Sequence, residues 1–139
     1  MIPETPLPWF VALYLAIFTI LTGVAFVAGW REGTAPRREI ALDALDNLGW
    51  IALGAAYWRA DVRALIGPWA ILLFLICFIW FFKSMEPAVA WLRQRPGMDE
   101  HRVRDLAWGG FAVNLLVVAP AFWWGLQVFL DAVRGLTQG

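Results

Sequence analysis

Two aspartates and an asparagine lie close together in one otherwise apolar segment of this sequence. Asp43, Asp46 and Asn47 are spaced i, i+3, i+4, so on a helix they would share one face. Such a group inside a hydrophobic segment could hold a cation, relay a proton or dock a polar group of another subunit. The alternative is a polar helix entrance, in which the two carboxylates favour the positive end of the helix dipole and pair with Arg37 or Arg38.

Asn114 is a further candidate, in the last apolar segment of the chain. It lies more than two turns inside that segment, so its amide needs a hydrogen-bond partner across a helix boundary. Together with Asp43 and Asp46 it could line a polar path in a small oligomeric transporter or channel.

Other reactive side chains are few. His101 is the only histidine, Cys77 the only cysteine and Ser84 the only serine. One histidine excludes a haem held by two histidines of this chain, and no Cys/His cluster could hold zinc or an iron–sulfur centre. We therefore predict no catalytic residue, no metal, no covalent cofactor and no enzymatic activity. Aromatic surfaces could still bind a lipid, a quinone or a pigment.

Composition places the chain in the membrane class. Of 139 residues, 61% are hydrophobic and 16% charged, whereas soluble domains have more charge and less apolar content. Ten tryptophans add to this, because Trp gathers where hydrocarbon meets water. The net charge of zero gives no reason to expect a nucleic-acid partner. We predict one membrane domain over residues 1–139, without a cleavable signal peptide.

The apolar segments predict an all-α integral membrane protein, with four transmembrane helices in an antiparallel bundle. The spans are expected at approximately 9–30, 38–58, 64–82 and 106–130. A short interfacial helix is expected at 87–95, between the third and fourth spans. Asp99 should cap the last helix and Pro120 should kink it. The predicted interface anchors are Trp9, Trp30, Trp58, Trp91 and Trp108.

Small residues at helical spacing predict two faces for close helix packing. The first helix carries Ala12, Ala16, Thr19 and Gly23 on one face. The last helix carries Gly110, Ala121 and Gly125, with Asn114 between them.

Hydropathy alone leaves the second crossing open. The uninterrupted apolar part, 48–58, covers about 16 Å and is too short to span, while a start at residue 40 brings in the two aspartates. Loop charge decides between the alternatives. With four crossings, one side of the membrane holds eight of the 11 basic residues, namely Arg31, Arg37, Arg38, Lys83, Arg93, Arg95, Arg102 and Arg104. With three crossings the split is six against five, which is no bias. The positive-inside rule thus predicts four crossings of a bacterial cytoplasmic membrane, with both termini outside the cytoplasm.

The run containing Arg38, Asp43, Asp46 and Asn47 distantly resembles the polar entrance to the second helix of the glutathione-using MAPEG enzymes. The resemblance covers about ten residues. Asp stands where that family usually has Glu, and the family's later Arg and Tyr features are not evident. The resemblance implies a third hypothesis, a membrane enzyme acting on a lipid-soluble substrate.

The predicted function is that of a non-catalytic small subunit that packs into and stabilises a larger membrane complex, respiratory, photosynthetic or transport. Its expected partners are the lipid bilayer and other membrane subunits. Aromatic surfaces, small-residue faces and the scarcity of titratable groups motivate this hypothesis. A small oligomeric transporter or channel is the alternative.

Overall fold

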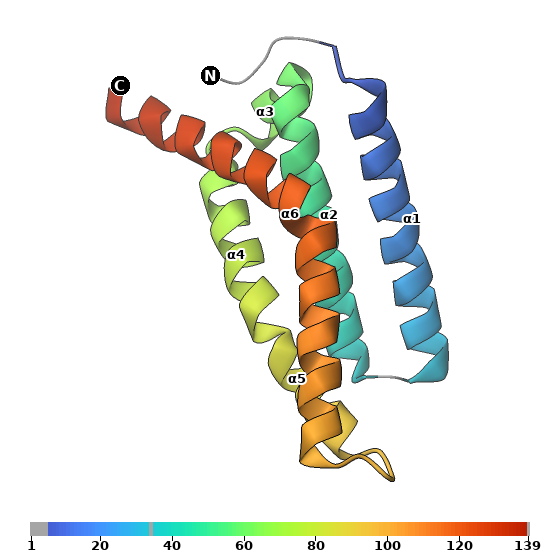
Figure 1. Cartoon of the computed structure of the whole chain (residues 1–139). Helices are drawn as coiled ribbons and strands as arrows, with labels where there is room; N and C mark the ends of the chain where they lie inside the picture. The colour runs from blue at the N-terminus through green and yellow to red at the C-terminus, as the bar shows by residue number, and fades with distance from the viewer. Residues whose placement is uncertain (1–5, 34, 139) are drawn as a thin grey trace.

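The computed structural model describes residues 6–33 and 35–138. Within these residues the chain is helical and forms no strand, which confirms the all-helical prediction. The helices are α1 (Trp9–Glu32), α2 (Arg37–Trp58), α3 (Ala60–Ile66), α4 (Trp69–Lys83), α5 (Met85–Arg93) and α6 (Glu100–Gln138). The four longest, α1, α2, α4 and α6, lie beside one another, and their chain directions alternate from one to the next (Figure 1).

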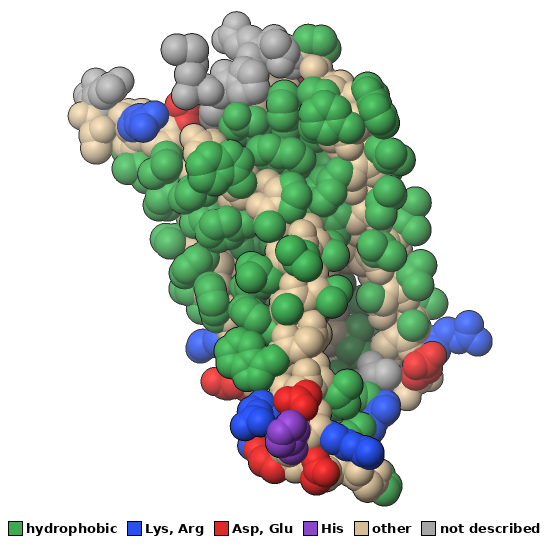
Figure 2. Space-filling view, viewed as in Figure 1, with side chains coloured by type: hydrophobic (Ala, Val, Ile, Leu, Met, Phe, Trp, Pro, Cys, Tyr) green, Lys and Arg blue, Asp and Glu red, His purple; other side chains and the backbone are tan. Residues whose placement is uncertain are grey.

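Charged side chains gather at one end of this helical body, which we call the charged end (Figure 2). It contains the connection between α1 and α2 and the connection between α5 and α6 (Figure 1). The other end, which we call the opposite end, contains α3 and the last turns of α6. Between the two ends the visible surface is almost wholly apolar (Figure 2).

Three helical stretches are long and apolar enough to cross a membrane: Trp9–Glu32, Trp69–Arg93 and Glu100–Thr137. The protein therefore has the helices of a membrane protein. α2 is not among the three, because its first turns carry Arg37, Arg38, Glu39 and the two aspartates. It nevertheless contacts α1, α4 and α6, so the least apolar of the long helices lies at the centre of the structure.

The third predicted span differs from the structure. The prediction of one helix over 64–82 is wrong at its start, because α3 and α4 are separate helices. Gly67 lies between them with φ 49°, and Pro68 caps the start of α4. A positive φ and a missing proline N–H both interrupt a helical ladder. The residues between the predicted second span, 38–58, and the predicted third span, 64–82, belong largely to α3.

The end of the third span also differs. α4 alone covers only about 22 Å at 1.5 Å per residue. Only Ser84 separates it from α5, which begins before Pro87 and ends at Arg93, so it covers most of the helix expected at 87–95. The stretch Trp69–Arg93 thus forms one nearly continuous run of the length that a bilayer requires.

The last helix begins where the Asp99 cap predicts and extends beyond the predicted span. α6 runs from Glu100 through residues 106–130 to Gln138. Asp99 caps it as predicted, since its Oδ1 accepts a hydrogen bond from the backbone N–H of Arg102 at 2.7 Å. Pro120 lies inside the helix, and Figure 1 shows the bend between its two halves. One turn before the proline, the Tyr14 hydroxyl donates to the carbonyl of Val117 at 2.6 Å and joins α1 to α6.

Small residues bring α2 and α6 close together. A Cβ on Gly54 would lie 3.9 Å from the Cα of Ala121, and a Cβ on Gly125 would lie 3.2 Å from the Cβ of Leu53. Beside this crossing Trp50 is fully buried, between aromatic rings of α4 and α6. Close backbone approach and interlocking rings are how helices associate in a bilayer, where burial of apolar surface adds little.

Candidate functional site

The three polar residues of α2 face two neighbouring helices. Asp43 lies toward α4, where its Oδ1 accepts a hydrogen bond from the indole N–H of Trp80 at 2.9 Å. Arg37 and Arg38, the partners expected for the aspartates, form no ion pair with either within the described residues. The Arg37 guanidinium lies instead 4.9 Å from the centre of the Trp30 ring. The polar-entrance hypothesis is thus wrong about the partner of Asp43, which is a tryptophan of α4.

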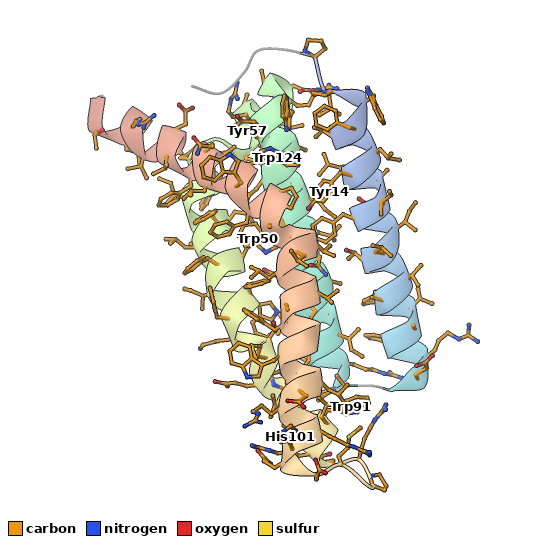
Figure 3. The ribbon with its side chains drawn as sticks, viewed as in Figure 1. Tyr14, Trp50, Tyr57, Trp91, His101 and Trp124 are labelled. Atoms are coloured by element: carbon orange, nitrogen blue, oxygen red, sulfur yellow. The ribbon has the colours of Figure 1, made fainter. Side chains whose placement is uncertain are left out.

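Asp46 lies one turn deeper on the same side of α2. Its backbone carbonyl lies 3.8 Å from Sγ of Cys77, which sits buried on α4. Its Oδ1 is buried and has no hydrogen-bond partner among residues 6–33 and 35–138. The same holds for Nε1 of Trp50, in the following turn (Figure 3 labels Trp50). The Trp50 indole lies beside the Asp46 carboxyl, so these two buried groups are a donor next to an acceptor on the same side of α2.

Asn47 belongs to the other side of α2. With Asp43 and Thr22 it lines a small groove of about 150 Å³ between α1 and α2. The hydroxyl of Thr22 is buried there without a partner in the described chain. Asn47 therefore faces the α1 side and Asp46 the α4 side, and Asp43 lies between the two.

Asn114 does not join this group. Its side chain is exposed, and it lines a separate depression of about 200 Å³ with residues of α5, including Ala88 and Leu92. No hydrogen bond from its amide is present within the described residues. Asn114 and Asp46 thus line different grooves and do not form one polar path.

The two predicted small-residue faces differ in burial. Ala121 and Gly125 are buried against α2, whereas Gly110 is exposed and a Cβ there would meet nothing within 4 Å. All four small residues of the α1 face, Ala12, Ala16, Thr19 and Gly23, are exposed. The predicted packing face of α1 therefore lies on the outside of the chain, and α1 buries the side containing Val11, Phe18, Thr22 and Gly29.

The predicted interface tryptophans lie toward the two ends of the helices. Trp9 begins α1 and Trp58 ends α2, so both lie toward the opposite end. Trp91, labelled in Figure 3, and Trp30 lie at the charged end, with Trp108 in the early turns of α6. Trp91 is also covered by Arg95, whose guanidinium lies 3.7 Å from its ring centre. This arrangement is typical of aromatic belts.

Ion pairs occur outside the apolar region. Arg93 and Glu100 pair at 2.6 Å at the charged end, next to His101, which lies 2.9 Å from Asp105. At the opposite end Arg59 pairs with Asp61 at 2.7 Å and lowers the pKa of that carboxyl to about 2. In the described part of the chain, no group of three or more His, Cys, Asp or Glu side chains could hold a metal ion.

Two residues of α4 were missed by sequence reasoning. Trp80 supplies the N–H for Asp43, and Lys83 lies one turn further along α4, on the same groove as Asp46. The sequence does indicate that Trp80 is a donor, because a tryptophan within an apolar helix needs an acceptor for its N–H. The sequence offers no way to match that donor to a carboxylate 37 positions away.

The approach of α4 to this part of α2 depends on Gly49. A methyl group at position 49 would overlap Sγ of Cys77. We expect Gly49→Ala to lower the free energy of unfolding by about 1–3 kcal/mol. Circular dichroism of the purified protein during thermal unfolding in detergent would measure the change.

A second substitution tests whether the overlap with Cys77 causes the loss of stability in Gly49→Ala. Cys77→Ala removes the overlapping sulfur, so the double variant should regain most of the stability lost by Gly49→Ala. Gly23→Ala is the matched control, because a Cβ at that position meets nothing within 4 Å. An equal loss in the single and double variants would show that the contact with Cys77 is not the reason.

Comparison with protein-family models, with curated proteins and with solved structures gives no significant match. Inferences about function therefore rest on the site itself.

Proposed function

We propose that this chain is a non-catalytic subunit of a larger membrane complex and that it crosses the membrane four times. α2 extends from the charged end to the opposite end with three helices around it, which supports its inclusion as a crossing. Its carboxylates then face neighbouring helices, as ionisable groups at membrane depth must. α2 is the second of these four spans, and the four spans together form an antiparallel bundle.

The distribution of basic residues orients this bundle. Arg31, Arg37, Lys83 and Arg93 belong to helix ends at the charged end, whereas few basic residues lie at the opposite end. By the positive-inside rule the charged end is cytoplasmic and both termini are outside the cytoplasm. A bacterial cytoplasmic membrane fits this orientation. α5, with Trp91 stacked against Arg95, lies at the cytoplasmic interface.

The exposure of Asn114 is the observation that carries the proposed role. It lies about 12 Å into the apolar part of α6, counted from residue 106 at 1.5 Å per residue. An unpaired amide facing lipid at that depth is unfavourable by about 1–3 kcal/mol. A polar side chain of another protein would satisfy it. Gly110, one turn earlier and equally exposed, leaves room for a second helix to approach.

The outer face of α1 supports the same conclusion. This face is a strip of small, exposed side chains that allows close approach of another helix, namely Ala12, Ala16, Thr19 and Gly23. The partners are thus other membrane subunits, of a respiratory, photosynthetic or transport complex. A transport path of its own is less well supported, because Asn114 and Asp46 line separate grooves.

Purification in a mild detergent tests this proposal. We expect the tagged protein to bring down other membrane proteins in fixed stoichiometry. Asn114→Leu combined with Gly110→Leu should abolish their recovery and leave the thermal unfolding of the isolated chain unchanged. Leu72→Phe on α4 is the matched control, since it also alters an exposed apolar position. Recovery of the chain alone, or only as copies of itself, would contradict the proposal.

A further inference from the structure

A groove separates α3 from the last turns of α6 at the opposite end. Its volume is about 380 Å³, within the range of small-molecule sites. Much of both walls consists of small residues, namely Ala60, Ala64 and Gly67 on α3 and Ala132 and Gly135 on α6. A Cβ at Gly135 would meet nothing within 4 Å, so the two helices leave room for another molecule between them.

Each wall of this groove also carries one charged side chain, and the two charges have opposite signs. Arg63 belongs to the α3 wall and Asp131 to the α6 wall. Within residues 6–33 and 35–138 neither of them forms an ion pair, with the other or with a third side chain. The Arg63 guanidinium donates to the backbone carbonyl of Tyr57 over a long 3.5 Å. The groove therefore offers a ligand both a cation and a carboxylate.

The groove lies where the apolar surface of the helices ends. The first residues of α4 border it, at Pro68 and Ala70, and both α4 and α6 belong to stretches long and apolar enough to cross a membrane. The large apolar side chains nearest to it are open to the surroundings, since Trp69 is 68% exposed and Leu136 is 67% exposed. Charges beside an exposed tryptophan at the end of a span are typical of the headgroup layer.

We propose that this groove binds the headgroup of phosphatidylethanolamine. The phosphate accepts hydrogen bonds from Arg63, whose planar guanidinium matches a phosphate with two parallel N–H donors. The ammonium group donates to Asp131, and the acyl chains leave the groove past Trp69 along α4. Both charges of the groove are then paired by one zwitterionic headgroup.

Other molecules with part of this chemistry fit less well. Phosphatidylcholine has the same two charges, but its quaternary ammonium has no N–H to donate to Asp131. Phosphatidylglycerol has the phosphate but no cation for that carboxylate. A water-soluble zwitterion matches both charges but has no apolar part to cover Trp69 and Leu136.

This binding requires neither the crossing by α2 nor a partner protein, so the purified chain is sufficient for the test. Native mass spectrometry would compare the dioleoyl forms of phosphatidylethanolamine, phosphatidylcholine and phosphatidylglycerol, each at the same molar ratio in the same detergent. We expect one phosphatidylethanolamine to be retained per chain. Its preference over each of the other two lipids should be at least about tenfold, because only its ammonium donates to the carboxylate.

Three variants separate the roles of the two charges and of the space between them. Arg63→Gln should weaken retention of phosphatidylethanolamine and phosphatidylcholine alike by about tenfold, because both lipids contain the phosphate. Asp131→Leu should remove the preference between these two lipids. Gly135→Leu fills the groove and should abolish retention. The matched controls are Gly110→Leu on the same helix and Arg134→Gln at the same end, and both should retain the lipid fully.

Three results would overturn the proposal. The first is equal retention of phosphatidylethanolamine and phosphatidylcholine by the unaltered protein. The second is undiminished retention by Gly135→Leu, whose exposed position outside the core keeps the variant informative. The third is displacement of the lipid by equimolar glycerophosphoethanolamine, which would identify a soluble zwitterion as the occupant. Failure of the proposed subunit role would appear separately, as the absence of co-purifying proteins.

Discussion

Gly125→Leu is expected to push α6 away from α2 and to lower the stability of the fold substantially. A Cβ at this position already lies 3.2 Å from the Cβ of Leu53 and 3.5 Å from the ring of Phe74. Both neighbours belong to the buried core, so neither can move aside without opening other contacts. We expect the free energy of unfolding to fall by about 3 kcal/mol, the upper part of the range for overpacked cores. Thermal unfolding in detergent, followed by circular dichroism, measures the loss.

Gly110→Leu is the matched control on the same helix. The chemical change is identical, but a side chain there meets nothing within 4 Å in this chain. Its effect on the unfolding of the isolated chain should be small, since Leu also has the higher helix propensity. Similar losses in both variants would show that the crossing with α2 is not the reason for the loss.

Cysteine labelling should place the two ends of α2 on opposite sides of the membrane. With a reagent that cannot cross the bilayer, we expect Ala60→Cys to label in intact cells and Glu32→Cys to label only after the membrane is opened. Both positions are exposed, and they lie just outside the two ends of α2. The expected difference is complete labelling against none, because a polar reagent either reaches the thiol or does not.

Two further positions extend the same measurement. Gln94→Cys should behave like Glu32→Cys, and Arg134→Cys should behave like Ala60→Cys. Cys77 is buried and should remain unlabelled, so it can be kept in place. Labelling of Ala60→Cys and Glu32→Cys from the same side would reject the crossing by α2, and with it the four-span topology.

The caps, kinks and breaks of the helices show how far local signals reach. The Asp99 cap and the Pro120 kink were both predictable, because each depends on a backbone donor within a few residues. The break between α3 and α4 was missed, although Gly67 and Pro68 adjoin in the sequence. The apolar residues on both sides make the segment look continuous by hydropathy.

The buried side of α1 could not be predicted in the same way. α1 is apolar on every side, so no polar face marks its outside. In a bilayer the lipid-facing and protein-facing surfaces are equally apolar, and fit between side chains decides which one is buried. That fit depends on Phe18 and Val11 meeting the neighbouring helices, and not on the small residues whose spacing suggested a packing face.

The sequence by itself determined that this protein is helical, apolar over most of its length and carries Asp43 and Asp46 within one otherwise apolar segment. These properties depend only on composition and on the spacing of charges along the chain, so they need no knowledge of tertiary contacts. Only the tertiary structure decided that this helix is the central one, that Asp43 meets Trp80, and that Asp46 lies on an open groove with Lys83 at its end. These contacts join residues more than 30 positions apart, and no local pattern in a uniformly apolar chain specifies which of them will meet.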